Sequence, residues 1–322
     1  MLTKSIVYAV PLFLLAGASF AQEFPLTMQH TYGETIIPEK PVHIVTWGWA
    51  VQDAVVALGE APVGIPHFTY GGDDNGALTW TKDAIAALGA DFPTILSQSG
   101  GVPYEAIAAL TPDVIIAVYS GITEEEYTRL SQIAPVVAFL DKPWSTTWQD
   151  TITLTGTAMG KAAEADALVA ELEQFIADET AKYPQVQGAS FAGIGGYDGA
   201  VSVYTAVDPR MTFLEDAGLT LAPSVAQLGD VNSFYYSLSF ERANELTSDI
   251  YITYADTDAD AEAFFGHPAM ARTLQVRSGA IASMVGPELI NSVSPPSALS
   301  LKWGYPEYIR RISEAVDKSK AQ

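Results

Sequence analysis

Residues 103–121 read PYEAIAALTPDVIIAVYSG, and residues 239–257 read SFERANELTSDIYITYADT. Both stretches place apolar residues at helical spacing before a short apolar run, which predicts a helix followed by a buried strand. They align without gaps, and the aligned pairs are Glu105 with Glu241, Leu110 with Leu246, and Asp113 with Asp249. The same unit in both halves of the chain predicts two similar lobes.

The sequence around the first copy alternates between strand-like and helix-like segments. From Val42 onward, VHIVTW favours a strand, AVQDAVVALG favours a helix that ends at Gly59, and PVGIP resumes extended structure. Further on, EEEYTRLSQIAP leads into VVAFL, and Thr123 with Glu126 has the spacing of a capping box. Alternating strands and helices predict a mostly parallel sheet with helices on both faces.

A different kind of segment lies between residues 147 and 183, which contain no proline and place apolar residues at helical spacing. At about 1.5 Å per residue such a helix would reach roughly 50 Å. Gly156 and Gly160 could bend or divide it. We predict an α/β fold of two Rossmann-like lobes with mostly parallel sheets, joined by one long connecting helix. The predicted parts are a signal peptide (1–21), an N-terminal lobe (22–145), the connecting helix (146–184) and a C-terminal lobe (185–322).

The first residues have the features of an export signal. Lys4 is the only early charge, the apolar stretch Ile6–Leu15 follows, and Ser19 and Ala21 are small. We expect cleavage after Ala21. Because the chain contains no cysteine that could carry a lipid anchor, we expect a soluble, monomeric protein of the periplasm, without stable membrane insertion.

The composition argues against several partners and chemistries. A formal net charge of -22 should repel nucleic acids and anionic lipids. The lack of cysteine removes disulfides and thiol catalysis. The four histidines lack the spacing of a helical metal site, so we expect no metal site built by the protein.

Several segments together resemble one known family. They are PEKPVHIV (38–45), LGEAPVG (58–64), YEAIAALTPDVIIA (104–117), LSQIAPVV (130–137) and SLSFERANEL (237–246). The chain resembles the substrate-binding proteins of ABC importers for ferric siderophores, haem and cobalamin. The resemblance implies two lobes bridged by a rigid helix. It also implies that a ferric siderophore is captured and delivered to an inner-membrane ABC permease.

The resemblance assigns permease docking to Glu105 and Glu241, because a glutamate of each lobe pairs with permease arginines in this family. An alternative reading is open, since the helix dipole favours a carboxylate in a first turn by a few tenths of a kcal/mol. Iron would arrive already chelated, so we expect no cofactor and no direct protein ligand to iron.

Aromatic side chains follow many of the predicted strands and are candidates for lining a cleft between the lobes. Flat rings with a polar tip suit a large, partly apolar chelate, although each ring alone could equally fill core or surface. Trp144, Trp148, Tyr197 and Tyr305 belong to this wider group. The aromatic and histidine candidates that we assign to the site are Trp47, Trp49, His67, Tyr70, Tyr119, Tyr204, Tyr235, Tyr236, Tyr254 and Trp303, the last of which should precede a final helix expected near residues 306–315.

Two further candidates concern the charge of the ligand. Arg210 precedes a helix at a position where the family commonly contacts its ligand, but it could instead pair with Asp208 or Asp216. Gln98 stands where related proteins can carry an arginine, and its neutrality favours a hydroxamate chelate over an anionic catecholate. The alternatives are haem, for which His67 could be an iron ligand, cobalamin, and an exported α/β enzyme. The enzyme is disfavoured because the sequence has neither a G-x-S-x-G elbow nor a P-loop.

Overall fold

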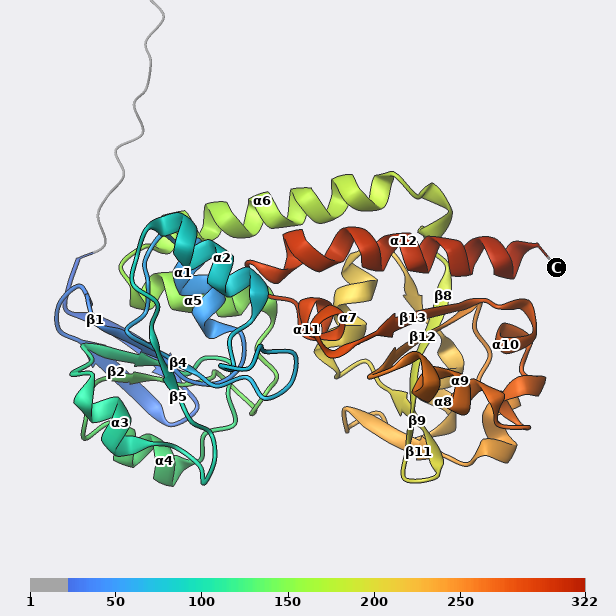
Figure 1. Cartoon of the computed structure of the whole chain (residues 1–322), viewed down its shortest axis with the longest axis horizontal. Helices are drawn as coiled ribbons and strands as arrows, with labels where there is room; N and C mark the ends of the chain where they lie inside the picture. Colours follow the sequence, from blue (N-terminus) through green and yellow to red (C-terminus); the bar gives the residue numbers. More distant parts are fainter. Residues whose placement is uncertain (1–22, 322) are drawn as a thin grey trace, which may run out of the picture.

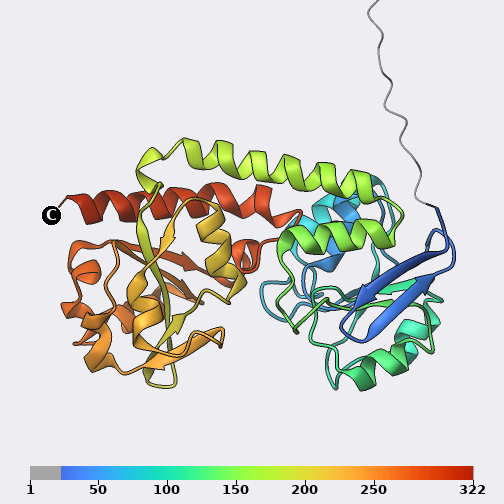
Figure 2. The ribbon, with the colours of Figure 1, turned by 180° about the vertical axis from the view of Figure 1, so that it is seen from behind.

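The computed structural model describes residues 23–321 and divides into two lobes that lie side by side (Figure 1). Two long helices, α6 (Ala162–Ala181) and α12 (Ser300–Lys320), run next to each other along one edge of the molecule, as the front and rear views agree (Figure 2). The predicted α/β class with two lobes is confirmed. The predicted signal peptide, residues 1–21, lies outside the described residues.

The N-terminal lobe contains a five-stranded sheet in which every neighbouring pair is parallel. Its strands, in spatial order, are β5 (Thr94–Leu96), β4 (Gly64–Pro66), β3 (Ile44–Thr46), β6 (Val114–Ile116) and β7 (Val136–Val137). In β6 the side chains alternate between two separate apolar clusters, with Val114 and Ile116 in one and Ile115 in the other. Each face of this sheet is therefore buried, which is why the strand is apolar throughout.

Helices cover both faces of the N-terminal sheet. Their bounds are α1 (Val51–Ala57), α2 (Thr79–Leu88), α3 (Tyr104–Ala109), α4 (Glu124–Leu130) and α5 (Trp148–Ala158). Apolar side chains of α1 and α5 pack on one face, and those of α3 and α4 pack on the other. The predicted capping box is present, because Thr123 accepts a hydrogen bond from the Glu126 amide and Glu126 accepts one from the Thr123 amide.

A β-hairpin at the start of the described chain was not predicted. It pairs β1 (Leu26–His30) with β2 (Gly33–Ile37) and forms a two-stranded sheet of its own. The hairpin is tied to the N-terminal lobe by a bond from the Thr35 hydroxyl to the Val136 carbonyl (2.6 Å) and by one from the Tyr32 hydroxyl to the Ile122 carbonyl (2.6 Å).

The C-terminal sheet is mixed. Its strands are β8 (Ser190–Tyr197), β9 (Ala200–Tyr204), β10 (Thr220–Leu221), β11 (Tyr235–Leu238), β12 (Ile250–Ala255) and β13 (Ile281–Val285). β8, β10, β12 and β13 are parallel, whereas β9 and β11 run antiparallel to their neighbours. The turn between β8 and β9 places Asp198 (φ 49°) and Gly199 (φ 71°) in the left-handed region, as a tight Asp-Gly hairpin requires.

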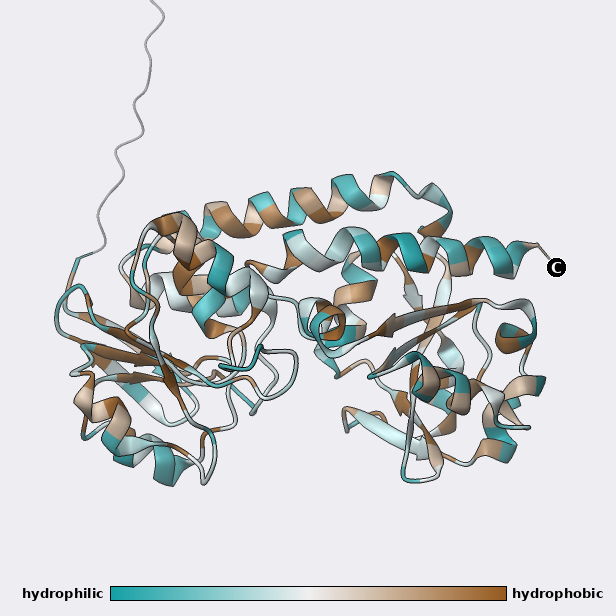
Figure 3. Ribbon diagram, viewed as in Figure 1, coloured by the Kyte–Doolittle hydropathy of each residue, from teal (hydrophilic) through white to brown (hydrophobic). Residues whose placement is uncertain are grey.

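The helices of the C-terminal lobe are short, apart from α12. They are α7 (Pro209–Asp216), α8 (Pro223–Leu228), α9 (Asp258–Gly266), α10 (Leu274–Ser278) and α11 (Pro287–Val293), with the 3-10 turns η1 (Pro184–Val186), η2 (Phe240–Glu245) and η3 (Met270–Arg272). Figure 3 shows the central strands of both sheets as strongly hydrophobic segments. Along the surrounding helices, hydrophobic and hydrophilic residues alternate. None of the helices in residues 23–321 combines the length and the hydropathy that a bilayer crossing requires.

The aligned aspartates of the two repeat copies, residues 103–121 and 239–257, make equivalent hydrogen bonds in the two lobes. Asp113 accepts hydrogen bonds from the amides of Val42 (2.8 Å) and His43 (2.7 Å), just before β3. Asp249 accepts bonds from the amide (2.7 Å) and hydroxyl (2.8 Å) of Ser190, where β8 begins. The backbone hydrogen bond from His43 lowers the pKa of Asp113, so its carboxylate stays charged. Each aspartate thus fastens its strand to the strand beside it.

The segment predicted as one connecting helix is two helices. Gly160 adopts φ 72° between α5 and α6, and α5 packs against α1 within the N-terminal lobe. α6 extends along both lobes, and α12 lies beside it and reaches the N-terminal lobe where Trp303 meets Trp80, which the sequence did not indicate. Lys302 of α12 forms an ion pair with Glu171 of α6 (2.5 Å). The break at Gly160 is consistent with the freedom of glycine to take positive φ.

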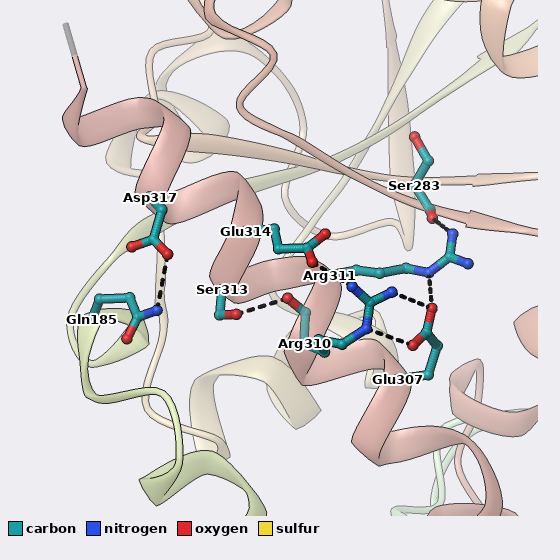
Figure 4. Close-up of polar contacts among 8 residues, drawn as sticks. All are labelled: Gln185, Ser283, Glu307, Arg310, Arg311, Ser313, Glu314 and Asp317. Atoms are coloured by element: carbon teal, nitrogen blue, oxygen red, sulfur yellow. Dashed lines mark hydrogen bonds and ion pairs between the residues drawn. The ribbon is translucent and has the colours of Figure 1, made fainter.

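The final helix is longer than predicted and is fixed to its sheet. In α12, Glu307 is held by Arg310 and Arg311, and Arg311 also donates to the Ser283 carbonyl of β13 (2.7 Å) (Figure 4). Pro306 lies inside this helix rather than at its start. One continuous apolar cluster contains residues of both lobes, such as Val55 and Ile252, together with Leu172 of α6. The lobes therefore share a core, which opposes large hinge movements.

Candidate ligand-binding cleft

A cleft lies between the two lobes where loops from each face the other. Its outer hollow has a volume of about 980 Å³ and is lined by residues 141–145 of the N-terminal lobe and by Val207 and residues 232–237 of the C-terminal lobe. An inner hollow of about 320 Å³ shares Trp144, Phe234 and Tyr235 with it and reaches Tyr119 and Arg210. Sites of a few hundred to about 1,000 Å³ are typical for small molecules.

The sheets explain why these loops meet. Tyr119 lies three residues beyond β6 and residues 141–145 follow β7, so both come from carboxyl ends of parallel strands. Ligands of open α/β sheets bind at these ends. From the other lobe, the segment 205–208 links β9 to α7, and Phe234 immediately precedes β11.

Two aromatic residues form the N-terminal wall of the cleft. Tyr119 and Trp144 meet edge to face, with ring centroids 5.7 Å apart and planes at 81°. Trp144 is 42% exposed and has φ 60°, and a Cβ added at Gly121 would lie only 2.3 Å from its indole nitrogen. Gly121 therefore leaves the space that the indole occupies. Burial raises the pKa of Tyr119, which keeps its hydroxyl protonated and able to donate.

Arg210 provides the cationic group of the inner hollow, but its charge is compensated. Its Nε donates to Asp208 Oδ1 (2.8 Å) and its Nη2 donates to Asp208 Oδ2 (2.5 Å). The guanidinium carbon stands 3.9 Å from the ring centroid of Tyr204 and 5.4 Å from that of Tyr254. Asp208 also caps α7 by accepting the Arg210 amide (2.9 Å). Of the two arrangements considered from the sequence, the structure shows the pairing with Asp208, while Arg210 still lines the cleft.

The structure brings six of the predicted residues to this cleft. Four of them line a hollow directly: Tyr119, Arg210, Tyr235 and Tyr236. Tyr204 and Tyr254 pack beneath the guanidinium, and Tyr254 bonds through its hydroxyl to that of Tyr308 (2.8 Å). Tyr236 donates its hydroxyl to the Val225 carbonyl (2.9 Å), which fixes its ring.

Tyr70, unlike the six residues at the cleft, forms hydrogen bonds that connect the two lobes. Its hydroxyl donates to Asp256 Oδ1 (2.6 Å), and its carbonyl accepts from the amide of Asn291. Burial raises the pKa of the Tyr70 phenol, so this donor persists at neutral pH. Tyr70 lies in the loop between β4 and α2, and its two partners belong to the other lobe.

Five other candidates lie apart from the two hollows that form the cleft. Trp47 is 8% exposed and belongs to the core of the N-terminal lobe. Trp49 packs against Phe68 and lines a narrow internal space of about 30 Å³. The Gln98 amide donates to the His67 carbonyl (2.8 Å), and the His67 ring lies against Gly76. Trp303 lies inside α12, with its ring centroid 5.4 Å from that of Trp80 in α2. Placing Trp303 before the last helix was wrong, because α12 begins at Ser300.

Some lining residues were not predicted. Phe234 directly precedes the predicted Tyr235 and Tyr236, so the aromatic run FYY was the available signal. Lys142 and Asp141 follow the VVAFL strand, and the strand-end rule that selected Trp144 applies to them as well. Pro295 reaches the inner hollow from the segment between α11 and α12, and no pattern in the sequence pointed to it.

The two predicted docking carboxylates are exposed. Glu105 lies in the first turn of α3, and Figure 1 shows this helix on the lower side of the N-terminal lobe. Glu241 lies in η2, a 3-10 turn and not the α-helix that the repeat predicted. Within residues 23–321 neither carboxylate forms an ion pair. Both are therefore available to an external partner.

Comparisons with known proteins agree on the architecture. Residues 44–285 match a family model described as periplasmic binding protein. The chain is 33% identical to a Streptococcus pneumoniae structure described as PiaA in complex with ferrichrome, with a TM-score of 0.83 over 91% of this chain and 99% of that one. A periplasmic solute binding protein of Mycobacterium smegmatis is 26% identical, with a TM-score of 0.78 over 90% and 98%.

A third structure, Staphylococcus aureus SirA complexed with staphyloferrin B, is 21% identical and shares the fold, with a TM-score of 0.67 over 91% of this chain and 98% of that one. No curated protein sequence matches the chain.

Proposed function

The chain belongs to the periplasmic binding protein family, and from this premise we propose that it captures a ferric siderophore of hydroxamate type between its lobes and delivers it to an ABC importer. The similarity to a ferrichrome complex over nearly the whole chain supports the class of ligand. The lining of the cleft supports it independently, through both its aromatic character and its charge.

The observation that carries the proposal is the neutrality of the cleft. The whole chain has a formal charge of -22. The two hollows, by contrast, are lined by two acids and two bases, namely Asp141, Lys142, Asp208 and Arg210. Three hydroxamate groups cancel the charge of a ferric ion, whereas three catecholate groups leave a large negative excess. A neutral cleft between aromatic walls favours the hydroxamate complex, because an unpaired buried charge would be costly.

We propose that delivery proceeds through Glu105 and Glu241. Their exposure and their lack of an ion-pair partner within residues 23–321 support this role. Two carboxylates, one on each lobe, would form charge-assisted hydrogen bonds with arginines of a permease. Because each lobe contributes one contact, the strength of docking would depend on the relative position of the two lobes.

We also propose that the mature protein begins after Ala21, acts as an untethered monomer in the periplasm, and performs no chemistry on its ligand. Membership in a family of binding proteins supports the last point. Iron would be bound as its chelate. The hydroxyl of Tyr119 and the Nη1 of Arg210, which makes no hydrogen bond within residues 23–321, would be directed to ligand oxygens rather than to the metal.

The test is a titration of residues 22–322 with each of five ligands: ferrichrome, a ferric tricatecholate, ferric citrate, haemin and cobalamin. Binding is measured by calorimetry and by tryptophan fluorescence. We expect saturable binding of ferrichrome at micromolar or tighter affinity, with quenching that is largely lost in Trp144→Phe. Saturation by haemin or cobalamin alone would select the alternative ligands within the family. A bound chelate that changes mass during incubation would indicate an enzyme.

A further inference from the structure

We propose that Asp208 determines the charge preference of the cleft, by holding Arg210 as a neutral pair that donates hydrogen bonds without attracting anionic chelates. This inference rests on the proposed function and deepens it. It assigns specificity to a residue that offers the ligand no donor of its own.

The geometry of the pair is the first argument. Both carboxylate oxygens of Asp208 are used by Arg210, through Nε (2.8 Å) and Nη2 (2.5 Å). A two-point contact of this kind fixes the guanidinium plane as well as its position. The backbone amide of Arg210 adds a third bond to the same carboxylate (2.9 Å). Asp208 therefore positions Arg210 from the N-terminus of the helix to which Arg210 belongs.

Burial makes the compensation effective. The side chain of Asp208 is 4% exposed and that of Arg210 is 23% exposed. Charges shielded from water interact strongly, so the carboxylate cancels most of the field that the guanidinium would otherwise project into the inner hollow. Within residues 23–321, the only other cation lining either hollow is Lys142, which lies in the outer hollow beside Asp141.

The pairing leaves part of Arg210 free to bind. Its Nη1 makes no hydrogen bond within the described chain, while Tyr204 supports the face of the guanidinium at 3.9 Å. Of the five guanidinium N–H groups, Asp208 takes two, so the two on Nη1 and the second one on Nη2 can be offered to a carbonyl or hydroxamate oxygen. The oxygen atoms of a neutral chelate need such donors and gain little from a full positive charge.

The experiment compares two ferric complexes of similar size, a neutral trihydroxamate and an anionic tricatecholate, in four proteins. These are the wild type, Asp208→Asn, Arg210→Gln and the double variant. Asparagine is as good a helix N-cap as aspartate, so the first variant removes charge with little effect on α7. Circular dichroism and thermal melting check the fold of each protein.

We expect Asp208→Asn to shift the ratio of dissociation constants toward the tricatecholate by about tenfold or more, because it leaves the guanidinium uncompensated. Arg210→Gln should shift the ratio in the opposite direction. The double variant should return it to near the wild-type ratio, with weaker binding of both chelates. High salt should reduce the first two shifts, since both are electrostatic.

The outcomes separate the inference from the proposed function. If the wild type binds the trihydroxamate but the ratio stays within about twofold in folded Asp208→Asn, Asp208 does not set specificity and the proposed function remains. If Asp208→Asn does not fold, the shift in Arg210→Gln decides. If the wild type binds neither complex, the proposed function fails and this inference fails with it.

Discussion

Tyr70 of the N-terminal lobe donates a hydrogen bond of 2.6 Å to Asp256 of the C-terminal lobe, across the boundary between them. Other bonds cross the boundary nearby: the Thr79 hydroxyl donates to Glu288 (2.5 Å), and the Ser297 hydroxyl donates to the buried Asp53. Together with the apolar core that both lobes share, these bonds favour a nearly fixed cleft. Ligand capture should then require little rearrangement of the lobes.

Replacing Tyr70 by phenylalanine should loosen this boundary. The substitution removes the bond to Asp256 but keeps the ring, so we expect a loss of about 1 kcal/mol in the free energy of unfolding. Hydrogen exchange should accelerate at the Phe68 amide, which bonds to the Gly76 carbonyl at the base of the same loop. Tyr197→Phe is the control, because Tyr197 is 67% exposed at a hairpin. Unchanged exchange in Tyr70→Phe would show that the bond does not hold the lobes together.

Gly121→Ala should damage the cleft without damaging the fold. The new Cβ would lie 2.3 Å from the indole nitrogen of Trp144, so the exposed indole must move. We expect a roughly two- to tenfold loss of siderophore affinity, since an aromatic contact contributes about 0.5–1.5 kcal/mol, and an altered tryptophan emission spectrum. Gly266→Ala is the matched control, because a Cβ at Gly266 would meet nothing within 4 Å. Equal affinities for the two variants would exclude Trp144 from the binding wall.

Glu307 should contribute stability that disappears in acid. Hydrogen bonds from Arg310 hold the pKa of Glu307 at about 2, below its usual 4.5. The folded-state pKa is the lower one, so the contribution is complete above pH 4.5 and is lost as the pH falls toward 2. The pair is partly exposed, and after solvent screening we expect Glu307→Gln to cost about 0.5–1 kcal/mol at pH 7.

Urea unfolding of Glu307→Gln and the wild type between pH 7 and pH 3 measures this contribution. The difference between the two proteins should shrink as the pH falls. Glu262→Gln serves as the control, because Glu262 is exposed on α9 and forms no ion pair within the described residues. A constant difference over this range of pH would contradict the assignment.

The strands at the centre of each sheet could be predicted from the sequence, because a strand that is buried on both faces is a continuous apolar run. The run VIIAVY is apolar on both faces, and Asp113 and Asp249 repeat because the same backbone groups need an acceptor in each lobe. The first turns of α12, which lie nearest the N-terminal lobe, were missed. The final helix was expected near residues 306–315, whereas α12 begins at Ser300 and contains Pro306 in its interior, although proline is best tolerated in a first helical turn.

The candidate site was predicted only in part, because strand ends identify an edge of the sheet but not the path of the loop that follows. Trp47 and Tyr119 both follow parallel strands and both are largely buried, yet Tyr119 lines a hollow of the cleft and Trp47 does not. Tyr70 was expected to contact a ligand, and the structure shows that its hydroxyl bonds to Asp256, a residue distant in sequence. The ion pair between Asp208 and Arg210 was one of the arrangements predicted for Arg210, because the two residues are separated by a single residue in the sequence.

Charge reversal at Glu105 and Glu241 should separate delivery from capture. Both carboxylates are exposed outside the hollows, so Glu105→Arg with Glu241→Arg should leave the affinity for ferrichrome within about twofold of the wild type. Repulsion between like charges at a permease should abolish stimulation of ATP hydrolysis by the reconstituted importer and should abolish uptake in cells. Glu164→Arg, an exposed site on α6 along the opposite edge, is the control and should transport normally. Normal transport by the double variant would remove both glutamates from the docking surface, whereas an equal loss in Glu164→Arg would show that any reversal of surface charge disturbs delivery.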